Sequence, residues 1–420
     1  MLLNSGALAR WLVAVALAAP LSTQAAGGVG AKAAPPGAAS RHDAARSDPF
    51  TAGSPTLLSR AGYVSTGPFA LGDDHDTRAV DAALGDARIC WLETAHFRIG
   101  CALSPCAPPP GKDGNELEKE LRALAQVLPK VDPKTRLLST WLRTHVFAQR
   151  VEQLYAEFQR RLGVRDESFP RAAPDTVDDE YMGEGPYLGQ RGKFIVLLFD
   201  RASSFGRYVK TYAGRDQGFA IRHHFVKEDA LLFATSEEFA QGRFRDDRSM
   251  HCHVVFNVVH NLLAGYRHFS HPVPPWFAEG FAQWHVRRLV PGFTNYTTLD
   301  EFSLDGRFAP RWDRAVRGLV DTGSFTPAKN VLAWTDYASM KFSDRMTIWS
   351  RVDYLLSLGD ERLRIFLDTC KRPFAAGVRF PSESELFVRQ AEALRAAWDL
   401  DASLFDQRWS AWVMQRYAAR

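Results

Sequence analysis

A long apolar helix, a proline-rich turn and a second helix form the feature that most constrains this chain. Between Asp246 and Tyr266, valines and leucines recur at helical spacing and form a wide apolar stripe, which is typical of a buried helix. The segment 271–275 contains three prolines and ends this helix, so that a second helix begins near Trp276. The small residues Gly280 and Ala282 would let the two helices approach closely.

Polar residues on the two helices have a defined spacing. His260 lies on the first helix, and eighteen residues separate it from Glu279 on the first turn of the second. At about 100° per residue, Phe256 and His260 lie one above the other on one helix face. The first helix therefore carries Phe-Asn-Val-Val-His at 256–260, and the second carries Trp-Phe-Ala-Glu-Gly-Phe-Ala at 276–282.

This pattern resembles the gluzincin metallopeptidases, in which an HExxH helix supplies two zinc ligands and a glutamate on a second helix supplies the third. The aminopeptidase-like members carry that glutamate in a Trp-x-x-Glu-Gly-x-Ala motif, which Trp276 to Ala282 matches. The chain more closely resembles exported bacterial peptidase-MA-like domains of the DUF1570 kind. The further matches are the strand pattern 91–99 and the element Tyr337-Ala338-Ser339, so that the resemblance spans roughly 88–417.

The chain departs from this family at two positions of the HExxH motif. Phe256 stands where the family has a zinc-binding histidine, and Asn257 stands where it has the general base. Phenylalanine has no lone pair for a metal, and asparagine cannot take a proton from water at neutral pH. The exchanges argue against hydrolysis by this mechanism. His260 and Glu279 would remain as a vestigial metal pair, joined by a charge-assisted hydrogen bond between the helices.

A neighbouring histidine could replace the missing ligand only with unusual geometry. His253 shares a face with His260, but the two backbones are ~10 Å apart along the helix axis. Both ring nitrogens would have to lie ~2.1 Å from one zinc. The other histidines near the motif are His251, His268, His271 and His285. His223 and His224 alternate faces on a predicted strand and are interpreted as ordinary surface and core residues.

The order of predicted elements indicates an α+β, zincin-like fold, with a small mixed sheet and helices followed by an all-helical C-terminal half. Strand patterns occur at 88–99, 193–200, 218–222 and 230–235, and helical patterns at 116–128, 134–162 and 204–212. We therefore divide the chain into a signal peptide (1–25), a flexible linker (26–85), an α+β part (86–245) and a helical part (246–420).

The N-terminus indicates a secreted or periplasmic protein. Arg10 precedes an apolar core from Trp11 to Leu21, and small residues place the cleavage site near Ala25. The apolar run is too short to span a bilayer, and no second segment is long and apolar enough. The net charge of +4 is not concentrated in one run, which argues against a nucleic-acid partner.

Export permits disulfides, and the five cysteines leave at least one thiol unpaired within the monomer. Cys101 and Cys106 bracket a turn-prone loop and are the predicted local pair, while Cys90 competes for either. Cys252 and Cys370 lie in helical stretches and are interpreted as buried small hydrophobes.

Our leading hypothesis is a non-catalytic pseudopeptidase that binds an extended peptide or protein in the groove between an edge strand and the motif helix. Tyr337 could reach this groove. No cofactor is expected. One alternative is a zinc metallopeptidase that remains active through non-standard ligands, and another is an exported structural protein whose cleft has no ligand.

Overall fold

The computed structural model describes residues 47–85, 87–174, 180–295, 311–338, 340–374 and 381–417. The predicted signal peptide with its cleavage site near Ala25, the first part of the predicted linker and Ser339 lie outside these ranges. Within them, every helix is too short or too polar to cross a membrane.

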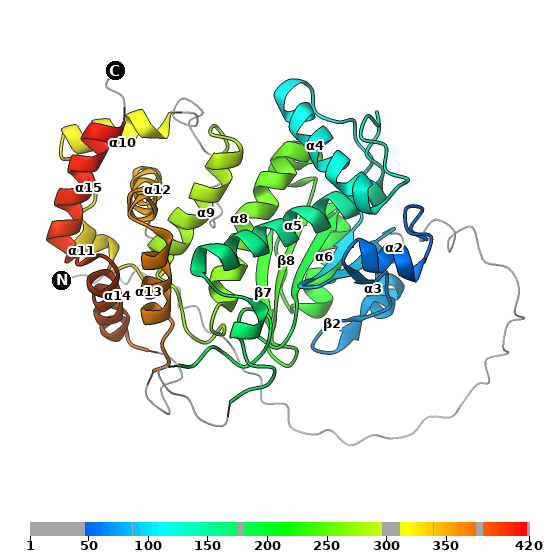
Figure 1. Ribbon diagram of the computed structural model, residues 1–420, viewed down its shortest axis with the longest axis horizontal. Helices are drawn as coiled ribbons and strands as arrows, with labels where there is room; N and C mark the ends of the chain where they lie inside the picture. Colours follow the sequence, from blue (N-terminus) through cyan, green and yellow to red (C-terminus); the bar gives the residue numbers. More distant parts are fainter. Residues whose placement is uncertain are drawn as a thin grey trace, which may run out of the picture.

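A six-stranded mixed sheet forms the centre of the N-terminal half, with the strand order β1-β4-β5-β6-β8-β7 (Figure 1). Strands β5, β6 and β8 are parallel, whereas the pairs β1–β4, β4–β5 and β7–β8 are antiparallel. The strands are β1 (Tyr63–Ser65), β4 (Cys90–Thr94), β5 (Phe97–Cys101), β6 (Phe194–Phe199), β7 (Ile221–Phe225) and β8 (Ala230–Ser236). The predicted mixed sheet is confirmed, and β7 forms one of its edges.

Helices cover both faces of this sheet, which explains why all six residues of β6 are buried. One face packs on α5 and α8 in the larger core, where α4 packs on α5, and the opposite face packs on α3 and α6 in a smaller core. These helices are α3 (Thr77–Ala83), α4 (Gly111–Val127), α5 (Thr140–Leu162), α6 (Ala202–Tyr212) and α8 (Asp247–Gly265). Between β8 and α8 lies the short helix α7 (Phe239–Gly242).

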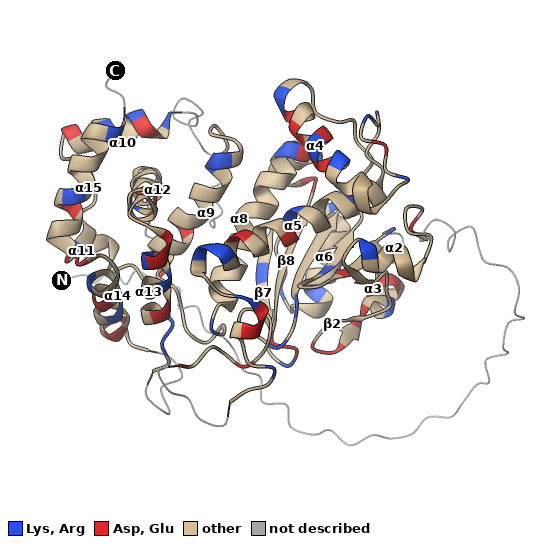
Figure 2. Cartoon of the chain, viewed as in Figure 1, with Lys and Arg blue, Asp and Glu red and all other residues tan. Residues whose placement is uncertain are grey.

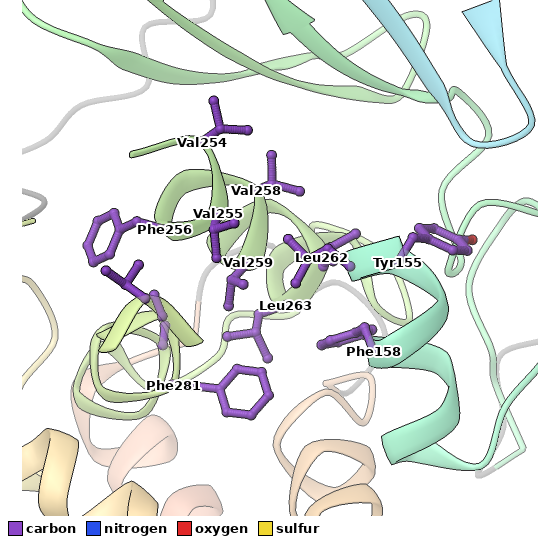
Figure 3. Close-up of a cluster of buried hydrophobic side chains, with 14 of the residues drawn as sticks. Tyr155, Phe158, Val254, Val255, Phe256, Val258, Val259, Leu262, Leu263 and Phe281 are labelled. Atoms are coloured by element: carbon purple, nitrogen blue, oxygen red, sulfur yellow. The ribbon is translucent and has the colours of Figure 1, made fainter. Parts of the chain in front are cut away.

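The C-terminal half is helical, as predicted, and α9 joins it to α8 (Figure 1). Its helices are α9 (Pro275–Leu289), α10 (Trp312–Asp321), α11 (Ala328–Val331), α12 (Phe342–Ser357), α13 (Asp360–Cys370), α14 (Glu383–Trp398) and α15 (Ala402–Arg416). Apolar side chains surround α8 on the sides turned toward α5 and α9 (Figure 3). Basic and acidic segments are interspersed over both halves (Figure 2).

The predicted flexible linker is wrong for residues 47–85. This segment forms α2 (Pro55–Arg60), β1, the two-stranded pair β2 (Ala70–Gly72) and β3 (His75–Asp76), and α3. Its elements are two to seven residues long, so no helical or strand periodicity can develop in the sequence. The segment is ordered instead by a few buried side chains and by helix N-caps, including Ser54 and Asp76.

All five cysteines have free thiols in this structure, so the predicted bond between Cys101 and Cys106 is not formed. Cys101 lies directly opposite Cys90 in the β4–β5 pair, whereas the backbone of Cys106 forms an isolated antiparallel β-bridge with that of Leu138. The strand register therefore places Cys101 next to Cys90.

Candidate functional site

The structure brings His260 and Glu279 together, as the spacing predicts. Both side chains are buried where α8 crosses α9, and His260 Nε2 lies 3.6 Å from Glu279 Oε2. This distance is too long for a hydrogen bond. Burial and, after it, the positive charge of Arg222 lower the pKa of His260 to about 4, against the opposing effect of Glu279. The predicted charge-assisted hydrogen bond is therefore wrong, because the imidazole is neutral and beyond bonding distance.

Glu279 pairs instead with an arginine from a third helix. Arg345 on α12 donates from Nη1 to Glu279 Oε1 at 2.9 Å, and both side chains are almost fully buried. Gly280 permits this approach, because a Cβ atom at that position would lie only 2.8 Å from the Ile348 carbonyl oxygen of α12. The predicted role of Gly280 in bringing α9 close to α8 is thus corrected, since the glycine faces α12.

Asn257, at the position of the family's general base, contacts a second arginine. Arg222 on the edge strand β7 donates from Nη1 to Asn257 Oδ1 at 2.9 Å, and Asn257 Nδ2 donates to the His253 carbonyl oxygen at 3.0 Å. The amide oxygen is thus engaged with a cation. A side chain with no proton-accepting nitrogen or carboxylate, held in this way, cannot serve as a general base.

Phe256 and Tyr337 complete the surroundings of His260. The Phe256 ring is fully buried with its centroid 4.8 Å from that of His260, in an edge arrangement. The centroid of the Tyr337 ring lies 5.7 Å from that of His260, also in an edge arrangement, and burial raises the pKa of its hydroxyl to about 12. Tyr337 therefore lies in the cleft, as proposed from the sequence, and remains a neutral hydroxyl at physiological pH.

The neighbouring histidines do not gather around His260. His253 contacts Thr235 Oγ1 at 3.1 Å and Asn295 Nδ2 at 2.8 Å, on the side of α8 toward the sheet. Burial lowers the pKa of His253 and of His285 to about 3. In the part of the chain that the structure describes, no three His, Cys, Asp or Glu side chains lie close enough to share a metal ion.

The donor set does not fit the zinc that the family resemblance implies. A zinc site needs at least three ligands, and among the described residues His260 and Glu279 are the two candidate ligands at the crossing of α8 and α9. The Glu279 carboxylate faces the Arg345 guanidinium, whose charge would repel a metal at the same place. We therefore derive no chemistry through a metal.

A groove of about 610 Å³ lies between β7 and the C-terminal half of α8. Its walls include Arg222, His260 and Tyr337. Next to it lies a smaller apolar pocket of about 240 Å³, lined in part by Pro274 and Trp334. The two share Pro272, Val273 and Tyr337 in their linings, so that they adjoin.

His223 and His224 both line this groove, from opposite faces of β7. His224 Nε2 contacts Asp229 Oδ1 at 2.8 Å and its ring stacks on Phe269, whereas the His223 ring packs against Phe225. The interpretation of these residues as ordinary surface and core residues missed their position at the groove.

Sequence reasoning also missed Arg222 and Arg345. Period-two alternation on β7 could have placed Arg222 on the same face as His224, but nothing in the sequence indicates that this face meets Asn257. Arg345 lies 66 residues after Glu279, on a helix whose position depends on packing.

Two comparisons with known proteins identify no relative of this chain. A scan against protein-family models finds no match, and a search of curated proteins also finds none. The gluzincin resemblance therefore depends on the residues quoted from this sequence.

Proposed function

We propose that this protein is a pseudopeptidase: a zincin-like protein that holds an extended peptide segment of a partner in the groove beside β7 and does not cleave it. The observation that carries the proposal is the pair of arginines at the former catalytic positions. Arg345 binds the carboxylate of the third-ligand position, and Arg222 binds the amide at the base position.

The charges at the crossing of α8, α9 and β7 support replacement of a metal. Arg222 and Arg345 place two positive charges beside Asn257 and Glu279, while His260 is neutral because burial lowers its pKa. Two guanidinium groups thus supply positive charge close to the position of a metal, without a Lewis acid or an activated water.

The sheet topology supports binding of an extended chain. In the described strand order β7 is bonded only to β8, so that its outer edge can accept a further strand. The groove follows that edge and the adjacent helix α8. An edge strand antiparallel to its neighbour, beside the motif helix, is also the arrangement expected of the zincin-like fold that we infer. Export to the periplasm or the medium remains part of this proposal.

A cleavage assay and a binding assay test the proposal together. The full chain is incubated with an array of random octapeptides, with added zinc and with a chelator, and products are read by mass spectrometry. We expect saturable binding of a subset of peptides and no chelator-sensitive cleavage. Chelator-sensitive cleavage, or the failure of every peptide to bind, would contradict the proposal.

A groove-filling variant locates the binding site. Ala264 lines the groove on α8, and Ala264→Trp should abolish binding by occupying it. Ala123 is exposed on α4, away from the groove, and Ala123→Trp serves as the matched control that should bind normally. Equal binding by both variants would place the peptide elsewhere on the molecule.

A further inference from the structure

Cys90 and Cys101 are neighbours on adjacent strands of the central sheet. They occupy opposite positions of the antiparallel pair β4–β5, and the next pair along, Trp91 and Gly100, continues the same register. The Cα atoms of opposite residues in an antiparallel pair are about 4.5–5.5 Å apart, and their side chains project from the same face of the sheet. This spacing falls within the ~4.4–6.8 Å that separates the Cα atoms of two cysteines in a disulfide. The pairing of β4 with β5 therefore places the two thiols where a disulfide can join them without a change of register.

A hydroxyl group of α5 contacts both thiols. Burial raises the pKa of Cys90 and of Cys101, and a hydrogen bond with the Thr144 side chain acts in the opposite direction at each of them. Helix α5 packs on both β4 and β5, so that Thr144 lies over the face from which the two cysteines project. Because both sulfur atoms are within hydrogen-bond reach of one hydroxyl, they lie close to each other.

Cys106 is the competing partner, and its backbone is paired elsewhere. Its N–H donates to the Leu138 carbonyl oxygen at 3.1 Å, and its carbonyl oxygen accepts from the Leu138 N–H at 2.8 Å. Its side chain is half-buried and lines a polar pocket together with Ser104 and Glu237. The strand register thus favours Cys90 over Cys106 as the partner of Cys101.

The two neighbouring thiols are covered once the chain has folded. Cys90 is 5% exposed and Cys101 is 0% exposed. Burial also keeps both groups protonated, since it raises their pKa, whereas only a thiolate attacks a disulfide. The folded, reduced chain should therefore oxidise slowly at this position. The bond would form more readily while β4 and β5 are paired and α5 has not yet covered them.

We propose that Cys90 and Cys101 form a disulfide during folding in an oxidising compartment, and that this bond stabilises the central sheet. The oxidant is a small-molecule or protein disulfide. The thiolate of one cysteine attacks a sulfur of the oxidant and releases one thiol, and the thiolate of the other cysteine then attacks the mixed disulfide and releases the second. The two cysteines together lose two electrons and two protons, which the oxidant takes up as it is reduced to two thiols. The proposed export would supply such a compartment, whereas the bond itself does not depend on peptide binding.

Refolding in a glutathione buffer tests this inference on the full chain. The protein is reduced and unfolded in urea and then refolded with reduced and oxidised glutathione, and the remaining thiols are blocked with N-ethylmaleimide. Trypsin cleaves after Arg98 and chymotrypsin after Leu103, so that Cys90, Cys101 and Cys106 fall in different peptides. We expect mass spectrometry to show the Cys90 and Cys101 peptides linked, and the link to disappear when the protein is reduced before digestion. A Cys101–Cys106 or Cys90–Cys106 bond as the main product, or five blocked thiols, would overturn the proposal.

The folded, reduced chain in the same buffer tests when the bond forms. We expect the link to appear there at least roughly tenfold more slowly than during refolding, because the thiols are covered and protonated. Equal rates in the two experiments would overturn formation during folding.

Serine variants test the pairing. Cys106→Ser removes the competing thiol and should leave the link between Cys90 and Cys101 unchanged. Cys90→Ser should leave Cys101 blocked by N-ethylmaleimide after refolding. If Cys90→Ser fails to fold, the peptide map of the unmodified chain and of Cys106→Ser still decides the pairing. Loss of the link in Cys106→Ser would overturn the proposal, since Cys106 would then be needed for the bond.

Urea unfolding tests the stabilising role. The unmodified chain is refolded either with oxidised glutathione or with an excess of reductant, and the two samples are compared. Closing a loop of this length with a disulfide should lower the equilibrium constant of unfolding by roughly 100-fold, so the oxidised sample should unfold at higher urea. Equal midpoints would overturn the conclusion that the bond stabilises the sheet.

Discussion

Replacing Arg345 with methionine should destabilise the fold strongly, because the exchange leaves the Glu279 carboxylate buried without its closest cation. The Nη1–Oε1 distance is 2.9 Å, and neither side chain is appreciably exposed. At an effective dielectric constant near 20, two charges at this distance attract by ~6 kcal/mol. Part of this attraction offsets the cost of burying the guanidinium, so we expect a loss of about 3–5 kcal/mol in the free energy of unfolding.

A double-mutant cycle isolates the pair. Arg345→Met combined with Glu279→Met removes both charges and fills similar volume, so the double variant should recover most of the stability that the single variant loses. Urea unfolding at pH 7.5, followed by circular dichroism and tryptophan fluorescence, gives the midpoints and slopes. Coincident transitions from the two probes are needed for the free energies to be comparable.

The pH dependence of the single variant provides a second check. Without Arg345, burial should raise the pKa of Glu279 in the folded state above its unfolded value. The deficit should then be largest above that folded pKa and should shrink as the pH falls and the carboxyl group takes up a proton. A loss below about 1 kcal/mol, or additive effects of the two exchanges, would refute the reasoning that Arg345 replaces a metal charge at Glu279.

Three further predictions concern packing, protonation and thiol access. His260 has a pKa of about 4 in the folded state, below its ordinary value of 6.5, so the stability that the neutral imidazole contributes is lost as the pH falls from 6.5 to 4. Between pH 8 and pH 5, the free energy of unfolding measured by urea titration should therefore fall by ~2 kcal/mol less in His260→Gln than in the unmodified chain. An unchanged pH dependence would contradict this prediction. Gly280→Ala should lower the free energy of unfolding by about 1–3 kcal/mol, because the new Cβ would lie 2.8 Å from Ile348 O and from Val352 Cγ2. A stabilised variant would contradict this, because it would show that α12 can shift away from α9 at little cost. Cys106 is half-buried and the other four thiols are buried, so maleimide should react with Cys106 first. Peptide mass spectrometry identifies the labelled cysteine, and faster labelling of any other cysteine would contradict the described burial.

The motif helices could be predicted because their signals are local. The apolar stripe predicted a helix from Asp246 to Tyr266, and the structure has Asp247–Gly265. The proline-rich turn placed the start of the second helix near Trp276, and it begins at Pro275. Helical geometry and the eighteen-residue spacing then brought His260 toward Glu279, which the 3.6 Å distance confirms.

The electrostatic partners could not be predicted, because they depend on tertiary packing. The sequence contains 52 lysines and arginines, and no local pattern distinguishes Arg222 or Arg345 from the others. Arg345 reaches Glu279 because Gly280 lets α12 pack closely, and Arg222 reaches Asn257 because β7 pairs with β8, the strand on which α8 packs. The expectation of a hydrogen bond between His260 and Glu279 failed for the same reason, since a better partner for the carboxylate comes from elsewhere in the chain.

The short N-terminal elements were missed for a different reason. A strand of three residues such as β1 has no measurable period, and its order depends on pairing with β4. Only buried positions such as Leu71 and Val80 mark this segment, and they are too sparse to distinguish a folded stretch from a linker.

The central claim is tested most directly by the zinc stoichiometry of the full chain. The protein is purified without chelators and equilibrated with a small excess of zinc. We predict well below one zinc per chain by mass spectrometry of the metal content. We also predict that Phe256→His with Asn257→Glu takes up zinc only when Arg345→Met frees the carboxylate of Glu279. One zinc per unmodified chain, lost in His260→Ala, would contradict the proposal that arginines have replaced the metal.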